Sequence, residues 1–206
     1  MTPTTARLAR LAGALLAGTL LLAGCSGNAQ TTTDGSPGSS PSTGQNADHN
    51  AADLSFATGM VPHHQSAITM ARLAPGRAAD QRILDLAARI QAAQAPEIDT
   101  LSAWLTEWGA DDLGGMDHSG MGHGTGDDTS GMSEQDMTAL TNASGAEFDR
   151  LFLAQMIPHH SSAVDMAVTE AADGQNTDAI AMAESIRDSQ TQEIAEMQTL
   201  LTELGG

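Results

Sequence analysis

Adjacent histidines flanked by methionines occur twice in this chain. Residues 60–71 read Met-Val-Pro-His-His-Gln-Ser-Ala-Ile-Thr-Met-Ala, and residues 156–167 read Met-Ile-Pro-His-His-Ser-Ser-Ala-Val-Asp-Met-Ala, at an offset of 96 residues. Imidazole nitrogen and thioether sulfur both bind metals, and a thioether favours soft ions over hard ones. The duplicated motif therefore predicts a site for a soft metal ion. The candidate ligands are Met60, His63, His64, Met70, Met156, His159, His160 and Met166.

Copper is the metal that this set of ligands favours. Histidine and methionine outside the cytoplasm, in a chain with a single cysteine, favour copper over zinc, iron or calcium, with Cu(I) preferred. Met60 precedes His63 by three residues and His64 by four, so these side chains are neighbours on a helix. Met60 and its copy can serve as ligands or as core residues. Met70 lies two turns farther on, so it and its copy are expected mainly to fill the core.

A second cluster of soft ligands lies between the two motifs. Met116, His118, Met121 and His123 fall in a Gly-rich, acidic stretch without helical periodicity. Such a stretch can wrap around an ion without a preformed site, although it can also be an accident of linker composition. Residues 110–136 are therefore expected to form a loop that carries metal ligands of its own.

Polar residues interrupt an otherwise apolar stripe downstream of each motif. Gln94 and Glu97 lie on this stripe in the first copy, and Gln190 and Glu193 lie on it in the second. A buried carboxylate needs a partner. Glu97 and Glu193 are expected to accept the free ring N–H of the histidines, as residues that orient metal ligands do. Direct coordination and a metal-free hydrogen bond between helices are the alternatives.

Helical periodicity places the histidines on an inward face. At about 100° per residue, one arc of the first helix collects residues that are all identical in the second copy. Pro62 and Pro158 fall inside the periodic run and are expected to kink a longer helix rather than to start a shorter one. The residues of the shared arc are Asp53, Phe56, Met60, His63, His64, Ala67, Met70 and Ala71.

Two repeated helical hairpins make up the part of the chain that is expected to fold. Repeat 1 spans residues 53–109 and repeat 2 spans residues 149–205, with turn signals at 75–76 and 173–174. The period is helical and no alternating strand pattern occurs. Neither hairpin can bury its apolar face alone, so the prediction is an all-α, four-helix bundle in a domain of residues 51–206. Ser133 is a candidate N-cap for the helix that follows the loop.

The first 50 residues are expected to target and tether this domain. Residues 1–24 combine a positive start with a short apolar run, as a secretory signal does. Cys25 follows Leu-Ala-Gly directly, which resembles a bacterial lipoprotein box and predicts a lipid anchor at this residue; an ordinary cleaved signal is the alternative. Residues 25–50 are rich in Ser, Thr, Gly and Pro and predict a flexible tether. The expected location is the extracytoplasmic face of the bacterial cell envelope, at the membrane.

The charge of the chain limits its partners. The formal net charge is −18, and the sequence contains no lysine. A polyanion of this kind does not hold phosphate backbones, so no nucleic acid is expected as a partner, whereas cations are attracted. A metal ion is the expected small partner. A copper-delivery protein and a second copy of the chain are the protein partners left open.

The residues of the motif also resemble a known family. The pattern Phe-x3-Met-[Val/Ile]-Pro-His-His-x2-Ala-x2-Met-Ala, followed by Gln-x2-Glu-Ile and Leu-x3-Gly, is similar to the DUF305 family over residues 53–205. The resemblance implies a ferritin-like helical bundle in a secreted or envelope protein, and copper handling by the motif's His and Met residues. The family pattern tends to place methionine three residues after Glu-Ile. The second copy has Met197 there and the first has Leu101, which argues against equal binding by the two halves.

The favoured function is therefore copper binding, with buffering or transfer of the ion by an envelope-anchored protein. A ferritin-like dimetal redox enzyme is one alternative, but such sites use Glu-x-x-His on facing helices. Met60 and Met156 stand where those glutamates would be. A metal-free surface scaffold is the other alternative. The sequence contains no nucleophile–base arrangement, phosphate loop or nucleotide fingerprint, so no enzymatic activity is assigned.

Overall fold

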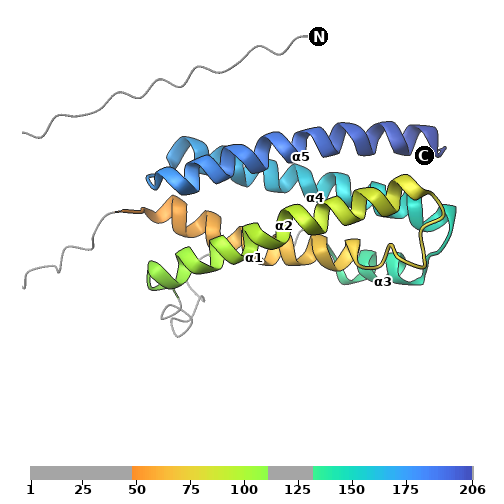
Figure 1. The fold of residues 1–206 in the computed structure, drawn as a ribbon, viewed down its shortest axis with the longest axis horizontal. Helices are drawn as coiled ribbons and strands as arrows, with labels where there is room; N and C mark the ends of the chain where they lie inside the picture. The colour runs from red at the N-terminus through yellow and green to blue at the C-terminus, as the bar shows by residue number, and fades with distance from the viewer. Residues whose placement is uncertain (1–47, 111–131, 206) are drawn as a thin grey trace, which may run out of the picture. The chain divides into compact units, whose positions relative to one another are not determined.

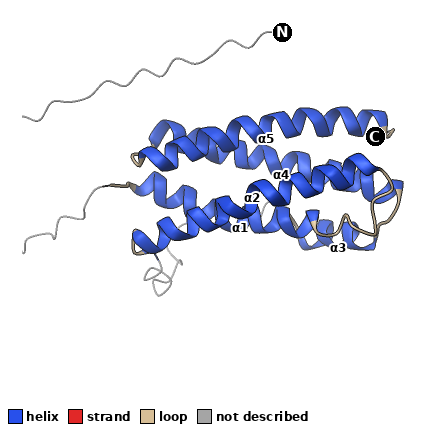
Figure 2. Cartoon of the chain, viewed as in Figure 1, coloured by secondary structure: helices blue, strands red, loops and turns tan. Residues whose placement is uncertain are grey.

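The computed structural model describes residues 48–110 and 132–205, and these ranges are almost entirely helical. No β-strand occurs within them (Figure 2). No helix in the described part of the chain is long and apolar enough to cross a bilayer. The helices are α1 (Ala51–Ala71), α2 (Gln81–Glu107), α3 (Glu134–Asn142), α4 (Ala146–Asp173) and α5 (Thr177–Glu203).

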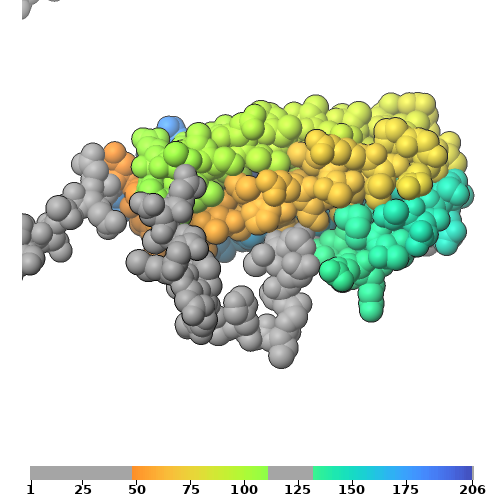
Figure 3. All heavy atoms as spheres, turned by 90° about the horizontal axis from the view of Figure 1, so that it is seen from below, coloured from red at the N-terminus to blue at the C-terminus, as the bar shows by residue number. Residues whose placement is uncertain are grey.

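Two long hairpins build the bundle. α1 packs along α2, α4 packs along α5, and an antiparallel contact between α1 and α4 joins the two hairpins (Figure 1). The space-filling view shows α1 and α2 against each other along their length (Figure 3). The short helix α3 packs on α4. The predicted all-α bundle of two repeated helical hairpins is confirmed.

The start of the second hairpin differs in detail from the prediction. Ser133 caps α3 as predicted, because its hydroxyl oxygen accepts the main-chain N–H of Asp136 at 3.1 Å. α3 already begins at Glu134, so residues 134–136 are helical and not part of a loop. α3 is also a separate helix, which the sequence did not predict, because α4 begins only at Ala146.

The first hairpin begins earlier than predicted. Asn50 caps α1 through a capping box with Asp53, in which each side chain accepts a main-chain N–H of the other residue. The side-chain amide of Asn50 also donates to the carbonyl of Asp173 at 2.8 Å. His49 stacks on the ring of Trp108. Residues 48–50, expected at the end of the tether, are therefore attached to the bundle.

The prolines lie inside continuous helices, as the extended periodicity predicts. Pro62 lies within α1, Pro158 within α4 and Pro96 within α2. Proline has no N–H, so the carbonyl of Thr58, four residues before Pro62, lacks the usual helical hydrogen bond just before the histidines.

All residues of the predicted inward arc of α1 are buried, which confirms the periodicity argument. Their copies in α4 are also buried, with one exception: Met166 is half-buried, whereas Met70 is fully buried. The core around them is divided into two apolar clusters. Met156 belongs to the cluster that contains Met70, and Met60 belongs to the other cluster. Because α1 and α4 run antiparallel, equivalent residues of the repeats lie in opposite clusters, and the polar layer with the histidines separates them.

Two aspartates of the shared pattern hold the hairpins together. Asp149 of α4 accepts the main-chain N–H groups of Ala79, at 3.1 Å, and Asp80, at 2.9 Å, at the start of α2. Asp53 of α1 accepts the N–H of Asn176 at 2.9 Å, at the start of α5. Each hairpin thus fixes the first turn of the other hairpin's second helix.

Candidate metal centre

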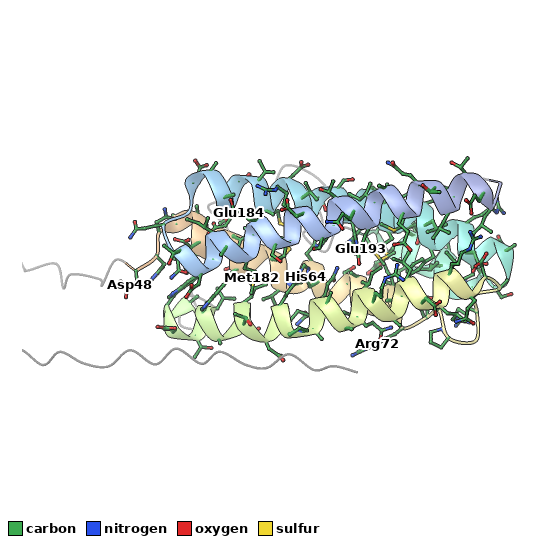
Figure 4. The ribbon with its side chains drawn as sticks, turned by 45° about the horizontal axis from the view of Figure 1, so that its top comes forward. Asp48, His64, Arg72, Met182, Glu184 and Glu193 are labelled. Atoms are coloured by element: carbon green, nitrogen blue, oxygen red, sulfur yellow. The ribbon has the colours of Figure 1, made fainter. Side chains whose placement is uncertain are left out.

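The four histidines of the two motifs are buried where α1 meets α4. His63 and His159 are 2% and 1% exposed, and His64 and His160 are fully buried. The rings of His63 and His159 approach each other across the helix interface, with centroids 3.8 Å apart and an interplanar angle of 41°. Figure 4 shows His64 and Glu193 in the middle of the bundle, well away from Asp48 at its end. The fold therefore brings the two motifs, distant in sequence, to one place.

His64 and His160 each contact a carboxylate on the neighbouring helix of their own hairpin. Nε2 of His64 lies 2.7 Å from Oε2 of Glu97, and Nε2 of His160 lies 2.7 Å from Oε2 of Glu193. An ionised carboxylate can only accept, so a neutral ring donates its Nε2–H and carries its lone pair on Nδ1. The two glutamate side chains are 21% and 18% exposed, so each links a buried imidazole to the surface. The sequence predicts this placement of both glutamates.

Ser162 fixes the ring of His63. Its hydroxyl donates to the main-chain carbonyl of His159 at 2.8 Å, so its oxygen accepts the Nε2–H of His63 at 2.7 Å. This tautomer again places the lone pair on Nδ1. Burial lowers the pKa of His63 to about 4; the nearby His64 and His160 lower it too, and the carbonyl of His159 acts in the opposite direction. His63 is therefore neutral at ordinary pH, as a metal ligand must be.

The Nδ1 atoms are the chemically informative part of this layer. Those of His63, His64 and His160 are buried and have no hydrogen-bond partner among the residues that the structure describes. A buried polar atom without a partner is costly, and native proteins seldom keep one without a reason. A lone pair on one ring nitrogen, with the other held by a carboxylate, is the usual state of a metal-binding histidine. The donor atoms present therefore fit a metal ion.

Histidine and carboxylate alone do not complete a site. In the described ranges, no three His, Cys, Asp or Glu side chains are arranged so that they could hold one ion. Thioethers can supply the missing donors, because Met60 and Met156 are fully buried one turn before the histidines of their helices. They lie in opposite apolar clusters and so flank the histidine layer from both sides.

The second methionine of each motif lies away from the histidines. Met70 and Met166 follow His64 and His160 by six residues, about 9 Å along a helix. Met70 is fully buried in an apolar cluster, in line with its expected core role. Met166 is half-buried, and its Sδ would lie 3.4 Å from a Cβ added at Gly59.

Two of the residues predicted to support the metal site form no hydrogen bond with a histidine in the described part of the chain. Gln94 and Gln190 are buried on their stripes, each 3% exposed. Their Oε1 atoms have no hydrogen-bond partner within the described residues. A role for these amides near a metal stays a prediction. Cys25 and the loop ligands Met116, His118, Met121 and His123 lie outside the described residues, as do the expected signal segment and most of the tether.

Two relevant residues are missing from the sequence-based site. Ser162 is visible in the motif, where Ser66 is its copy, but the sequence alone does not connect it with His63. Glu170 is 1% exposed beside Asp53; burial raises its pKa to about 8, and contact with Asp53 adds to the effect. Glu170 has no counterpart in the first copy, which has Ala74 at the equivalent position. A comparison of the two repeats therefore does not identify Glu170.

Solved structures that resemble this chain include one protein with bound metals. CopM in its Cu(I)-bound form has a TM-score of 0.60 and 30% sequence identity, with 75% of this chain and 98% of that chain covered. CopM in its Cu(II)-bound form has a TM-score of 0.60 and 33% identity, covering 73% and 96%. A DUF305 protein from Streptomyces coelicolor has a TM-score of 0.65 and 27% identity, covering 78% and 95%.

The family assignment follows from the sequence match. No curated protein matches the chain. The family model described as "Domain of unknown function (DUF305)" matches residues 53–201, which include both histidine motifs and both glutamates that contact them. With this match over most of its length and these structural relatives, the chain belongs to the DUF305 family.

Proposed function

We propose that this protein binds copper, with Cu(I) preferred, in the histidine layer between its two hairpins. The observation that carries the proposal is the pair of buried, unpartnered Nδ1 atoms of His64 and His160, whose Nε2 atoms contact Glu97 and Glu193. The metal-bound forms of CopM support copper as the ion.

The glutamates and the methionines have different roles in binding the ion. Glu97 and Glu193 hold the rings of His64 and His160 in one orientation and one tautomer, so little ordering is needed when the ion arrives. Met60 and Met156 add sulfur to the donors, which favours Cu(I) over Zn(II). A bound ion supplies positive charge that satisfies the buried lone pairs.

We further propose that the protein buffers or transfers copper at the extracytoplasmic face of the envelope, attached through lipid on Cys25. The signal-like residues 1–24 and the Leu-Ala-Gly sequence before Cys25 support this. We expect the parent protein in the membrane fraction, with the mass of a diacylated or triacylated chain, and a Cys25→Ser variant in the soluble fraction. Membrane association of both forms would exclude the lipid anchor.

A competition titration with a coloured Cu(I) chelator tests the metal proposal. The full chain carries Cys25→Ser in every sample, so that a thiolate cannot account for binding. The parent is compared with a variant in which His63, His64, His159 and His160 are alanine. We expect the parent to retain Cu(I) against the chelator and the variant to lose at least one equivalent.

Two controls make the result decisive. Circular dichroism shows whether the quadruple variant remains helical, and His64→Gln with His160→Gln offers a milder change if it does not. A parallel titration with Zn(II) is expected to show weaker binding. Equal, weak Cu(I) binding by parent and variants would favour a metal-free scaffold, and turnover of oxygen or peroxide by the copper-loaded parent would favour a redox enzyme.

A further inference from the structure

A pocket of about 540 Å³ lies at the end of the bundle where α2 ends and α5 begins, remote from the histidine layer. Trp104 in its wall follows Glu97 by seven residues on α2, about 10 Å along the helix. Figure 4 shows Asp48, another lining residue, at this end. The side chains that give the pocket its character are Asp48, His49, Trp104, Glu107, Trp108 and Asp178.

Stacked aromatic rings form one wall. The rings of His49 and Trp108 have centroids 4.8 Å apart at an interplanar angle of 13°, and those of Trp104 and Trp108 are 5.7 Å apart at 14°. The chain has two tryptophans and no tyrosine, and its three phenylalanines are all buried in the core. Both indoles are instead partly exposed at this pocket. Both indoles pack against the apolar cluster that contains Met60, and the exposed part of each ring is available to a ligand in the pocket.

The charge around this wall is negative. The carboxylates of Asp48, Glu107 and Asp178 line the pocket, and no arginine does so among the described residues. The C-terminal end of α2 adds the partial negative charge of its last carbonyls. The N-terminal end of α5 contributes partial positive charge, which opposes this effect. The side chain of Asn176 reduces that contribution, because it accepts the N–H groups of Asp178 and Ala179. The balance favours a cation.

We propose that this pocket binds a small organic cation with an alkylammonium or quaternary ammonium head group. An ammonium group placed against an indole face is attracted by the ring quadrupole, and neighbouring carboxylates add to the attraction. A strongly hydrated inorganic ion would gain little from the aromatic wall. The proposal is independent of copper binding, because the pocket shares no residue with the histidine layer.

The two tryptophans make the test direct, since the intrinsic fluorescence of the chain comes from this pocket alone. The full chain is titrated with choline and, in parallel, with the neutral isostere in which a tert-butyl group replaces the trimethylammonium head. We expect a saturable change in tryptophan emission with choline and a much weaker, unsaturated one with the isostere. No saturable change with choline, or equal responses to both compounds, would overturn the proposal.

Charge variants keep the fluorescent reporter intact. Glu107→Gln with Asp178→Asn is expected to weaken choline binding by roughly fivefold or more. Asp165→Asn, which removes an exposed carboxylate from α4, is the control and is expected to leave the affinity unchanged. An equal loss of choline affinity in the double variant and in Asp165→Asn would show that only the net charge of the protein matters and would overturn the site. Calorimetry of Trp108→Leu, with its melting temperature as a check on folding, should show no choline binding.

Discussion

Three of the four motif histidines have a hydrogen-bond partner of their own. His64 and His160 use Nε2 to contact Glu97 and Glu193, whereas His63 uses Nε2 to contact the hydroxyl of Ser162. In each case the ring is anchored by the nitrogen farther from the main chain. The residues that anchor the rings thereby decide which nitrogen remains for a ligand.

The first prediction concerns these anchors. Glu97→Gln with Glu193→Gln keeps the size of both side chains but replaces the carboxylates, so the imidazoles lose orientation and basicity. We expect the affinity for Cu(I) to fall by about 10-fold or more. The chelator competition assay measures the loss. Glu184→Gln, an exposed position on α5, serves as the control. Unchanged affinity in the double variant would show that the two glutamates only clamp helices.

The second prediction concerns the buried carboxyl of Glu170. Burial raises its pKa from 4.5 to about 8, with further contributions from Asp53. The folded protein therefore binds the Glu170 proton more tightly than the unfolded chain does. This contribution to stability is complete below pH 4.5 and is lost as the pH rises through about 8.

We expect urea denaturation of the parent to show a free energy of unfolding that declines across this pH window. In Glu170→Gln the side chain stays neutral, so the decline attributable to this residue should disappear and the variant should be the more stable protein at the alkaline end. Glu184→Gln should retain the parent's profile. If the stability of Glu170→Gln depended on pH as that of the parent does, the pKa of Glu170 would not be the cause of the decline.

At the scale of the elements, the hairpins are joined crosswise by carboxylates. Asp53 and Asp149 each lie in the first turn of one hairpin's first helix. Each accepts hydrogen bonds from main-chain N–H groups at the start of the other hairpin's second helix. Arg89 of α2 adds a surface ion pair to Glu196 of α5 at 2.6 Å. Exposed ion pairs of this kind contribute little, so the buried aspartates hold the junction.

The third prediction follows from this arrangement. Asp149→Ala leaves the N–H groups of Ala79 and Asp80 without their acceptor, so we expect a loss of about 2–4 kcal/mol in the free energy of unfolding. Asp85→Ala removes an exposed aspartate from α2 and should change it by less than about 0.5 kcal/mol. Denaturant titration of both variants gives the comparison. A similar, small effect of the two would show that the junction depends on apolar packing.

At the scale of the whole molecule, an ion in the histidine layer would connect both hairpins, because His63 and His64 come from α1 and His159 and His160 from α4. The fourth prediction is therefore that Cu(I) raises the melting temperature. A ligand that binds only the folded state at about 100 times its Kd adds about 2.7 kcal/mol of stability. Calorimetric melting with and without Cu(I) measures the shift. The variant with four alanines should melt at one temperature in both conditions.

The sequence predicts the parts of this molecule that depend on local periodicity. The inward arc of α1, the two hairpins and the contact of Glu97 with a histidine follow from spacing and from the need of a buried charge for a partner. Other contacts depend on which distant segments meet after packing. The hydrogen bond from the main-chain N–H of Asn176 to Asp53, the stacking of His49 on Trp108 and the contact of the buried Glu170 with Asp53 all join residues whose separation carries no periodic signal.

The contacts that Asp53 and Asp149 make with the opposite hairpin have an evolutionary consequence. Each hairpin contains its own imidazole–carboxylate pair. Each also receives from the other hairpin an aspartate that accepts N–H groups at the start of its second helix. A half-length polypeptide of one hairpin would therefore regain every one of these groups by self-association as a homodimer. Fusion of two such genes would free the halves to diverge, and Glu170 opposite Ala74 is a difference of the kind that such divergence would produce.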